Sequence, residues 1–117
     1  MPAMAEPSGF INVPAAFVPH DRVMAFQVQG ECLSGDGIHD GDHVLVDPER
    51  PVADGDIAVI RTRRGPLVKH LHRAHRALLM LPSNPDFGPV VITTEDAPVI
   101  VGRVIASIRF TEDTRNG

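Results

Sequence analysis

The sequence contains one cysteine, and it stands in a setting that suits a nucleophile. Cys32 lies in the run GECLSGDGIHDGD, residues 30–42, which holds four glycines and follows a predicted strand. A glycine-rich turn lets backbone N–H groups point outward, where they can stabilise negative charge that develops on a carbonyl oxygen. A lone cysteine is more often a small buried hydrophobic residue, so the turn alone leaves both roles open. Ser34, two positions further on, offers an alternative hydroxyl nucleophile.

A lysine that could serve as the base lies 37 positions after Cys32. Lys69 belongs to an alternating stretch, in which it shares one face of a predicted strand with Leu67 and Leu71. Burial between leucines disfavours an ammonium group, and an uncharged amine can take a proton from a nucleophile. The alternative is that Lys69 lies at a sheet edge, with its stem over the leucines and its amine in water.

These two residues need strands to hold them in place. Eleven prolines, ten glycines and many β-branched residues predict short strands, tight turns and little helix. We expect strands over residues 23–29, 43–46, 57–63, 67–73, 77–81, 90–94 and 99–110. The only helical turns that we expect lie at residues 32–35 and near Arg73. The spacing predicts one all-β domain, mainly antiparallel, with the form of a sandwich or half-barrel.

The two ends of the chain differ from this domain in composition. Four prolines predict an extended arm over residues 1–20, and a polar sequence predicts a flexible tail over residues 111–117. The domain itself is expected to span residues 21–110.

The charge is unevenly distributed, although the net charge is only −4. Residues 57–85 hold six bases and no acid, so they could form an anion-binding face. The pI of about 5.8 favours instead a solvated hairpin that faces an acidic surface, and direct nucleic-acid binding is not expected. The histidines at 70, 72 and 75 have no acid nearby, so we expect neither a metal nor another cofactor. No apolar run could span a membrane, and the single cysteine agrees with a cytoplasmic protein.

Six segments, which follow one another along the chain, resemble segments of the LexA/UmuD peptidase family. Residues 30–33 resemble its Gly-Asp-Ser-Met motif, with Cys32 in the place of the nucleophilic serine. Residues 68–71 resemble the Val-Lys-Arg-Leu run that carries the base, at the spacing of the family. The remaining similarities are to Gly-Ile-x-Asp-Gly-Asp at 37–42, Gly-Asp-Ile at 55–57, Pro-x-Asn-Pro at 82–85 and the last core strand at 101–105. The resemblance covers roughly residues 13–110.

The resemblance implies the fold of the LexA C-terminal domain and of signal peptidases. It implies that Cys32 is the nucleophile and Lys69 the general base, with an oxyanion hole formed by the backbone of Cys32 and Leu33. It also implies self-processing, linked to the DNA-damage response or to phage-type regulation, with the attacked peptide in the N-terminal arm. Because UmuD-like proteins cut before Gly-Phe, the bond between Ser8 and Gly9 is the expected scissile bond.

The exchanged nucleophile leaves two functions open. A thiol beside an ammonium group can ionise and form an ion pair, so a working Cys–Lys peptidase is one interpretation. The other is a catalytically retired module for dimerisation, or for binding a polymerase, a recombinase filament or another protein. In the family the C-terminal strand often mediates pairing, so residues 99–110 are the expected homodimer edge. No helix-turn-helix pattern precedes the strands, which favours the comparison with UmuD.

Overall fold

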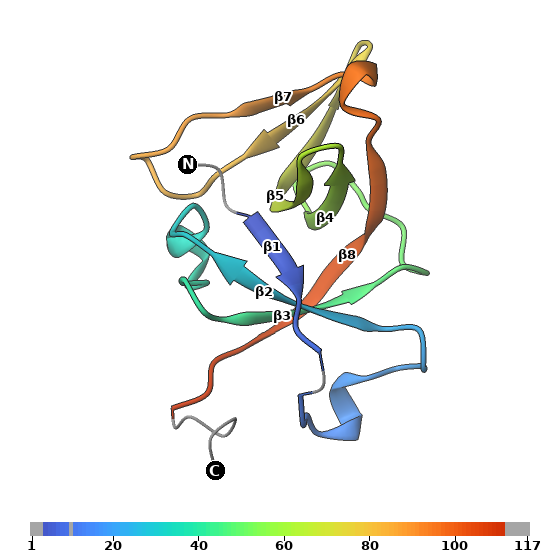
Figure 1. The fold of residues 1–117 in the computed structure, drawn as a ribbon, viewed down its shortest axis with the longest axis vertical. Coiled ribbons are helices and arrows are strands. Elements are labelled where there is room, and N and C mark those ends of the chain that lie inside the picture. The colour runs from blue at the N-terminus through green and yellow to red at the C-terminus, as the bar shows by residue number, and fades with distance from the viewer. Residues whose placement is uncertain (1–3, 10, 112–117) are drawn as a thin grey trace.

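Strands dominate the computed structural model of the chain, which describes residues 4–9 and 11–111. Within these residues it contains eight strands and three short 3-10 helices (Figure 1). The strands are β1 (Met4–Pro7), β2 (Met24–Gln29), β3 (His43–Asp47), β4 (Ile57–Thr62), β5 (Gly65–Ala74), β6 (Ala77–Leu81), β7 (Val90–Ile92) and β8 (Val99–Ile108), and the helices are η1 (Ala15–Phe17), η2 (Ser34–Asp36) and η3 (Thr94–Asp96). None of the helices in the described residues is long and apolar enough to cross a membrane.

The strands form one antiparallel sheet that closes on itself. Its order is β1-β2-β3-β8-β4-β5-β6-β7, and Met4 of β1 also pairs with Leu67 of β5. The six strands β1, β2, β3, β8, β4 and β5 therefore close into a barrel. Strands β6 and β7 extend beyond it at the top of Figure 1. The predicted all-β, mainly antiparallel fold is confirmed.

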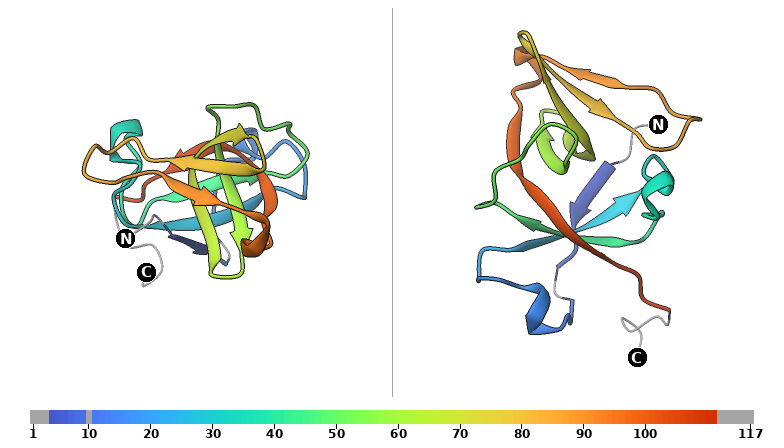
Figure 2. Two further views of the ribbon diagram at one scale, coloured as in Figure 1. Left: turned by 90° about the horizontal axis from the view of Figure 1, so that it is seen from above. Right: turned by 180° about the vertical axis from the view of Figure 1, so that it is seen from behind.

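Strand β8 joins the two halves of the barrel. Its first half pairs with β4 and its second half with β3, and Arg103 pairs with both strands. Figure 2 shows from behind that β8 runs along most of the length of the molecule. A Cβ at Gly102 would lie 2.5 Å from the carbonyl oxygen of Asp47, so only glycine allows this close approach of the backbones.

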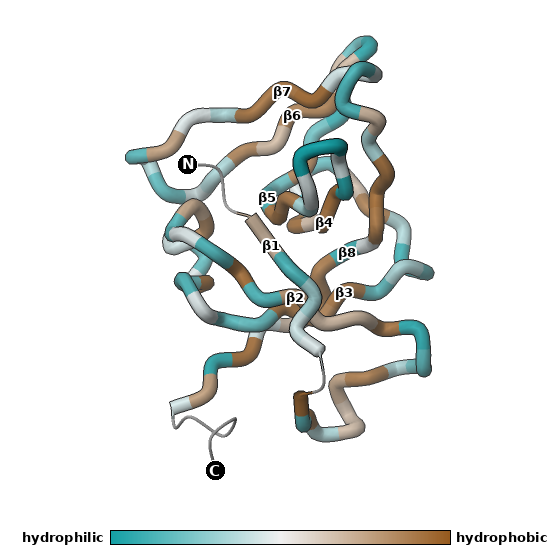
Figure 3. Tube along the Cα trace, in the orientation of Figure 1, coloured by the Kyte–Doolittle hydropathy of each residue, from teal (hydrophilic) through white to brown (hydrophobic). Residues whose placement is uncertain are grey.

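The core is aliphatic and divides into two clusters. Along the chain, apolar residues concentrate on the strands and polar residues on the connecting loops (Figure 3). The first cluster contains Ala5, Phe26, Val28, Cys32, Leu33, Ile38, Val44, Val46, Val59 and Val68, and the second contains Ala58, Ile60, Leu67, Leu71, Met80 and Ile92. The two clusters alternate along β4 and β5, because successive side chains of a strand point to opposite faces.

The seven predicted strands all form, with ends within two residues of those expected. The expected helical turn near Arg73 is wrong, because Arg73 lies in β5 and pairs with Leu78 of β6. The turn expected at residues 32–35 forms slightly later, as η2. Strand β1 and helices η1 and η3 were not anticipated, since prolines obscure the first two and η3 depends on a local capping box between Thr93 and Asp96.

The basic block does not form one face. Its arginines lie near the two ends of β5, with Arg61 and Arg64 by the turn from β4 and Arg73 and Arg76 by the turn to β6. A ten-residue strand separates these turns by roughly 30 Å. Lys69, in the middle, is buried. The expectation of a single hairpin face over residues 57–85 is therefore wrong.

Candidate active site

Cys32 lies in a tight turn directly after β2. Gly30 begins the turn with a φ of 98°, in the left-handed region that favours glycine. The N–H of Ser34 donates to the carbonyl oxygen of Glu31 (3.2 Å), and η2 then starts at Ser34. Cys32 has no exposed surface. The turn thus places the thiol in the interior of the protein.

The segment after β6 holds this turn from the other side. The N–H groups of Ser83 and Asn84 both donate to the carbonyl oxygen of Cys32, at 2.9 and 3.0 Å. The Asn84 side chain donates to the carbonyl oxygen of Glu31 (3.0 Å). A Cβ at Gly35 would collide with the carbonyl oxygen of Ser83, so the two segments are in direct contact. Sequence reasoning identified residues 82–85 as a motif but gave them no role.

The structure offers one candidate donor for the expected oxyanion hole, the backbone N–H of Leu33. Leu33, which follows the nucleophile position, is buried. Among residues 4–9 and 11–111, no acceptor receives a hydrogen bond from its backbone N–H. Buried N–H groups almost always have partners, so an unpaired one beside a nucleophile suits a carbonyl oxygen that arrives with the substrate.

Lys69 lies in the middle of β5, opposite Ala58 of β4. It is only 1% exposed, and its neighbours on the same face, Leu67 and Leu71, are also buried. In the described part of the chain it makes no ion pair with a carboxylate. The alternative of a lysine with its amine in water at a sheet edge is therefore wrong. Such complete burial is unusual for a lysine side chain, because its polar end is costly to remove from water.

Three contacts bring the turn of Cys32 against the part of β5 that carries Lys69. At the end of β1, Met4 pairs with both Gln29, just before the turn, and Leu67. Leu81 pairs with His70, and the chain then continues to the Ser83 N–H that binds Cys32. The third contact joins the His70 side chain to Asp36 of η2. The barrel thus places the turn that contains Cys32 beside strand β5, which carries Lys69.

The expected scissile bond lies elsewhere in this conformation. The Ser8 N–H donates to the Ala25 carbonyl oxygen (2.9 Å), and Ser8 Oγ lies 2.7 Å from His43 Nδ1. Because β1 runs antiparallel to β2, Met4 lies at the Cys32 end of β1 and Ser8 follows the opposite end. The structure therefore does not bring Ser8 and Gly9 to Cys32. Phe10 and the tail from residue 112 lie outside the described residues. Ser34, the alternative nucleophile, is half-buried at the start of η2.

An ion pair between the buried carboxylate of Asp42 and the exposed side chain of Arg109 supports the far side of the turn. Arg109 donates from Nε and Nη2 to the two carboxylate oxygens of Asp42, at 2.9 and 3.0 Å, and from Nη2 to the carbonyl oxygen of Gly37. Burial by itself would raise the pKa of Asp42, but the hydrogen bonds from Arg109 and from the His39 N–H outweigh it, and the pKa lies below its usual value. The carboxylate thus stabilises the folded state above its ordinary pKa of about 3.9, and this contribution is lost as the pH falls through the lowered value.

Replacing Arg109 by alanine is expected to lower the free energy of unfolding at pH 7, because Asp42 would lose a charged donor. The loss should be small because the Arg109 side chain is exposed to solvent. The difference between the variant and the wild type should shrink as the pH falls below about 4, the ordinary aspartate pKa, and should disappear below the lowered pKa of Asp42. Urea unfolding at pH 7 and pH 3 measures both effects. Arg61→Ala removes an exposed arginine of β4 and is the control; equal losses in the two variants would contradict the role of the ion pair.

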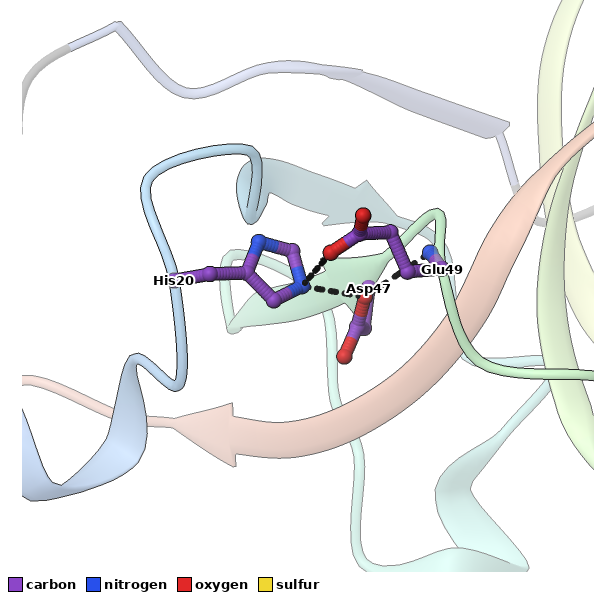
Figure 4. Close-up of side chains that lie close together, drawn as sticks. All are labelled: His20, Asp47 and Glu49. Carbon is purple, nitrogen blue, oxygen red and sulfur yellow. Dashed lines mark hydrogen bonds and ion pairs between the residues drawn. The ribbon is translucent and has the colours of Figure 1, made fainter.

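A second cluster of polar side chains lies apart from this site and was missed in the sequence. His20 Nε2 lies 2.7 Å from Asp47 Oδ1 and 3.0 Å from Glu49 Oε2 (Figure 4). Ligand atoms of these three residues lie within 4.8 Å of one another, close enough for a metal ion. Arg22, however, donates to both oxygens of Glu49 and holds its pKa below the usual value, and Arg50 approaches Asp47. The arrangement is therefore an ion-pair network that fastens the N-terminal arm to the end of β3.

Comparisons with known proteins identify the class to which this chain belongs. The family model described as peptidase S24-like matches residues 1–105. A LexA repressor from Syntrophotalea carbinolica is 34% identical over 99 residues, which cover 85% of this chain and 49% of the relative. A LexA repressor from Azoarcus sp. is 33% identical over 97 residues, with coverage of 82% and 48%.

The chain belongs to the peptidase S24-like family. It spans about half the length of the curated relatives that it matches.

Proposed function

We propose that this protein is a peptidase that uses Cys32 as its nucleophile and Lys69 as its general base. The observation that carries the proposal is the burial of Lys69, without a carboxylate partner among the described residues, on the strand against which the turn of Cys32 lies. Fully buried lysines without an ionic partner are rare in proteins, and they are found mainly at functional sites. Membership of a peptidase family supports the same proposal.

The reaction would follow the general course of nucleophilic catalysis. The neutral amine of Lys69 takes the thiol proton, and the Cys32 sulfur attacks a peptide carbonyl carbon. The negative charge that develops on the carbonyl oxygen is accepted by backbone N–H groups of Cys32 and Leu33. The amine product leaves with the proton from Lys69, and water then hydrolyses the thioester.

The proposed substrate is the N-terminal arm of the same chain, cut between Ser8 and Gly9. Ser8 follows the end of β1 that lies away from Cys32. This cut therefore requires β1 to leave the barrel. A partner that stabilises the released arm would then promote cleavage, which is the role proposed for a recombinase filament. We place the reaction in the cytoplasm and in the DNA-damage response, on the strength of the LexA-like relatives.

Mass spectrometry of the purified chain after alkaline incubation tests the proposal. The wild-type chain should be cut, while Cys32→Ala and Lys69→Ala should each slow cleavage by at least about 100-fold, because each removes an essential proton or electron-pair donor. Ser34→Ala is the control and should cut at the wild-type rate. Undiminished cleavage by either of the first two variants would refute the Cys–Lys pair. A fragment mass that does not match Ser8–Gly9 would refute that bond alone.

A second function is favoured by the pairing of β8. Residues 104–108 pair with β3 alone among the described strands, so one edge of this half-strand has no strand beside it. Phe110, just beyond the end of this half-strand, is exposed. An open edge suits pairing with a second copy, and we propose that the homodimer forms there. If the wild-type chain dimerises but never cleaves, the protein is a retired interaction module, which could still bind a polymerase.

A further inference from the structure

The His70 side chain joins the strand of Lys69 to the turn of Cys32. His70 follows Lys69 on β5, and Asp36 lies in η2, immediately after the Cys32 turn. His70 Nε2 lies 2.7 Å from Asp36 Oδ2, and His70 Nδ1 lies 2.7 Å from the carbonyl oxygen of Gly55. The imidazole therefore bridges three segments, two of which carry the proposed dyad.

The partners of this imidazole determine its protonation. A backbone carbonyl oxygen can only accept a hydrogen bond, so Nδ1 must carry a proton. An ionised carboxylate likewise only accepts, so Nε2 must carry one as well. Only the protonated imidazolium form of His70 can donate from both nitrogens and so make the two 2.7 Å contacts together. A neutral imidazole has one donor and would leave one of the two contacts unmade.

The surrounding charges agree with this geometry. Burial of His70 would lower its pKa, but the hydrogen bond to Gly55 and the carboxylate of Asp36 outweigh that effect, and the pKa is raised. Asp36 on η2 and Asp56 before β4 are the charged groups that face His70 among the described residues, and Asp56 also pairs with Arg103 (3.5 Å). The stabilisation is present in full below the ordinary histidine pKa of about 6.5 and is lost as the pH rises through the raised value.

The resembled family motif has arginine, a permanent cation, at the position of His70. We infer that His70 is a positioning residue whose positive charge holds the turn of Cys32 against the strand of Lys69. We call this contact between His70 and Asp36 the lock. Because a histidine loses its charge as the pH rises, the lock opens with rising pH. The inference deepens the proposed peptidase function and rests on it for its consequence. Loss of the lock displaces the nucleophile from the base, so above the raised pKa of His70 the wild type should cleave more slowly than a variant whose lock stays closed.

Hydrogen exchange at the amides of Asp36 and Gly37 reports on the lock without any need for catalysis. Both amides are hydrogen-bonded in the turn, at 2.9 Å, so their protection falls when the turn opens. In the wild type, protection corrected for intrinsic exchange should fall about tenfold between pH 5.5 and pH 8.5. His70→Gln should show the low protection at both pH values, and His70→Arg should keep the high protection at both. His72→Gln, which changes the next-but-one residue of the same strand, should match the wild type.

The cleavage rates of the same variants separate this inference from the proposed function. A faster alkaline reaction in His70→Arg than in the wild type would support the positioning role. Equal protection in His70→Gln and His72→Gln, or wild-type protection that does not change with pH, would overturn it. A pH-dependent lock in a chain that never cleaves would overturn the peptidase proposal and leave the lock established.

Discussion

Gly35→Ala is expected to lower the free energy of unfolding by about 2 to 3 kcal/mol, because the new methyl group collides with the Ser83 backbone. The carbonyl oxygen that it meets belongs to a residue whose own N–H binds Cys32. Neither segment can withdraw without breaking hydrogen bonds of the Cys32 turn. Denaturation by urea measures the loss, and cleavage should fall together with stability.

Gly88→Ala is the matched control for this variant. Gly88 lies in the connection between β6 and β7, which also contains Ser83. A Cβ at Gly88 would meet no atom within 4 Å. Neither glycine has a positive φ, so backbone strain does not distinguish the two positions. We expect a change within about 0.5 kcal/mol for Gly88→Ala. If both variants were equally stable, the contact between residues 35 and 83 would not be a tight one.

Lys69→Met is expected to raise the free energy of unfolding by about 1 to 3 kcal/mol while it abolishes the base. Methionine has a similar length and fills the space between Leu67 and Leu71, but it has no polar group that must be kept from water. Residues at functional sites commonly reduce stability in this way. Thermal or urea unfolding measures the gain.

Arg61→Met provides the control, because Arg61 is an exposed cation on the neighbouring strand β4. Its removal should change stability by no more than about 0.5 kcal/mol. A loss of stability in Lys69→Met would mean that Lys69 has a favourable partner in the folded state. A thiolate of Cys32 would be such a partner, and the dyad would then be an ion pair.

Local patterns were enough to predict the strands and to identify Lys69 as a candidate, but they left open whether its amine is buried. Alternating apolar residues and turn glycines act over a few positions, so the seven strands follow from the sequence itself. Lys69 could be singled out because it interrupts a row of leucines. Strand β1 escaped prediction because its four residues end in proline and it is stabilised only by pairing with β2 and β5.

The contacts that complete the site depend on distant residues and could not be predicted. Asn84 binds the carbonyl oxygen of Glu31 across 53 positions, and His70 binds Asp36 across 34. His20 and Asp47 are 27 positions apart. The local sequence around these residues gives no sign of the partners that they bind. Their partners become evident only when the barrel closes.

The rate at which iodoacetamide alkylates Cys32 at pH 7, in the wild type and in Lys69→Met, tests the central claim most directly. Cys32 is buried, so the absolute rate also depends on access to the thiol. The comparison removes this dependence if both proteins keep the same fold, which their circular dichroism spectra can verify. Because only the thiolate reacts, a base that takes the thiol proton should make the wild type react at least about tenfold faster. Equal rates in the two proteins would show that Lys69 does not activate Cys32 and would contradict the proposed dyad.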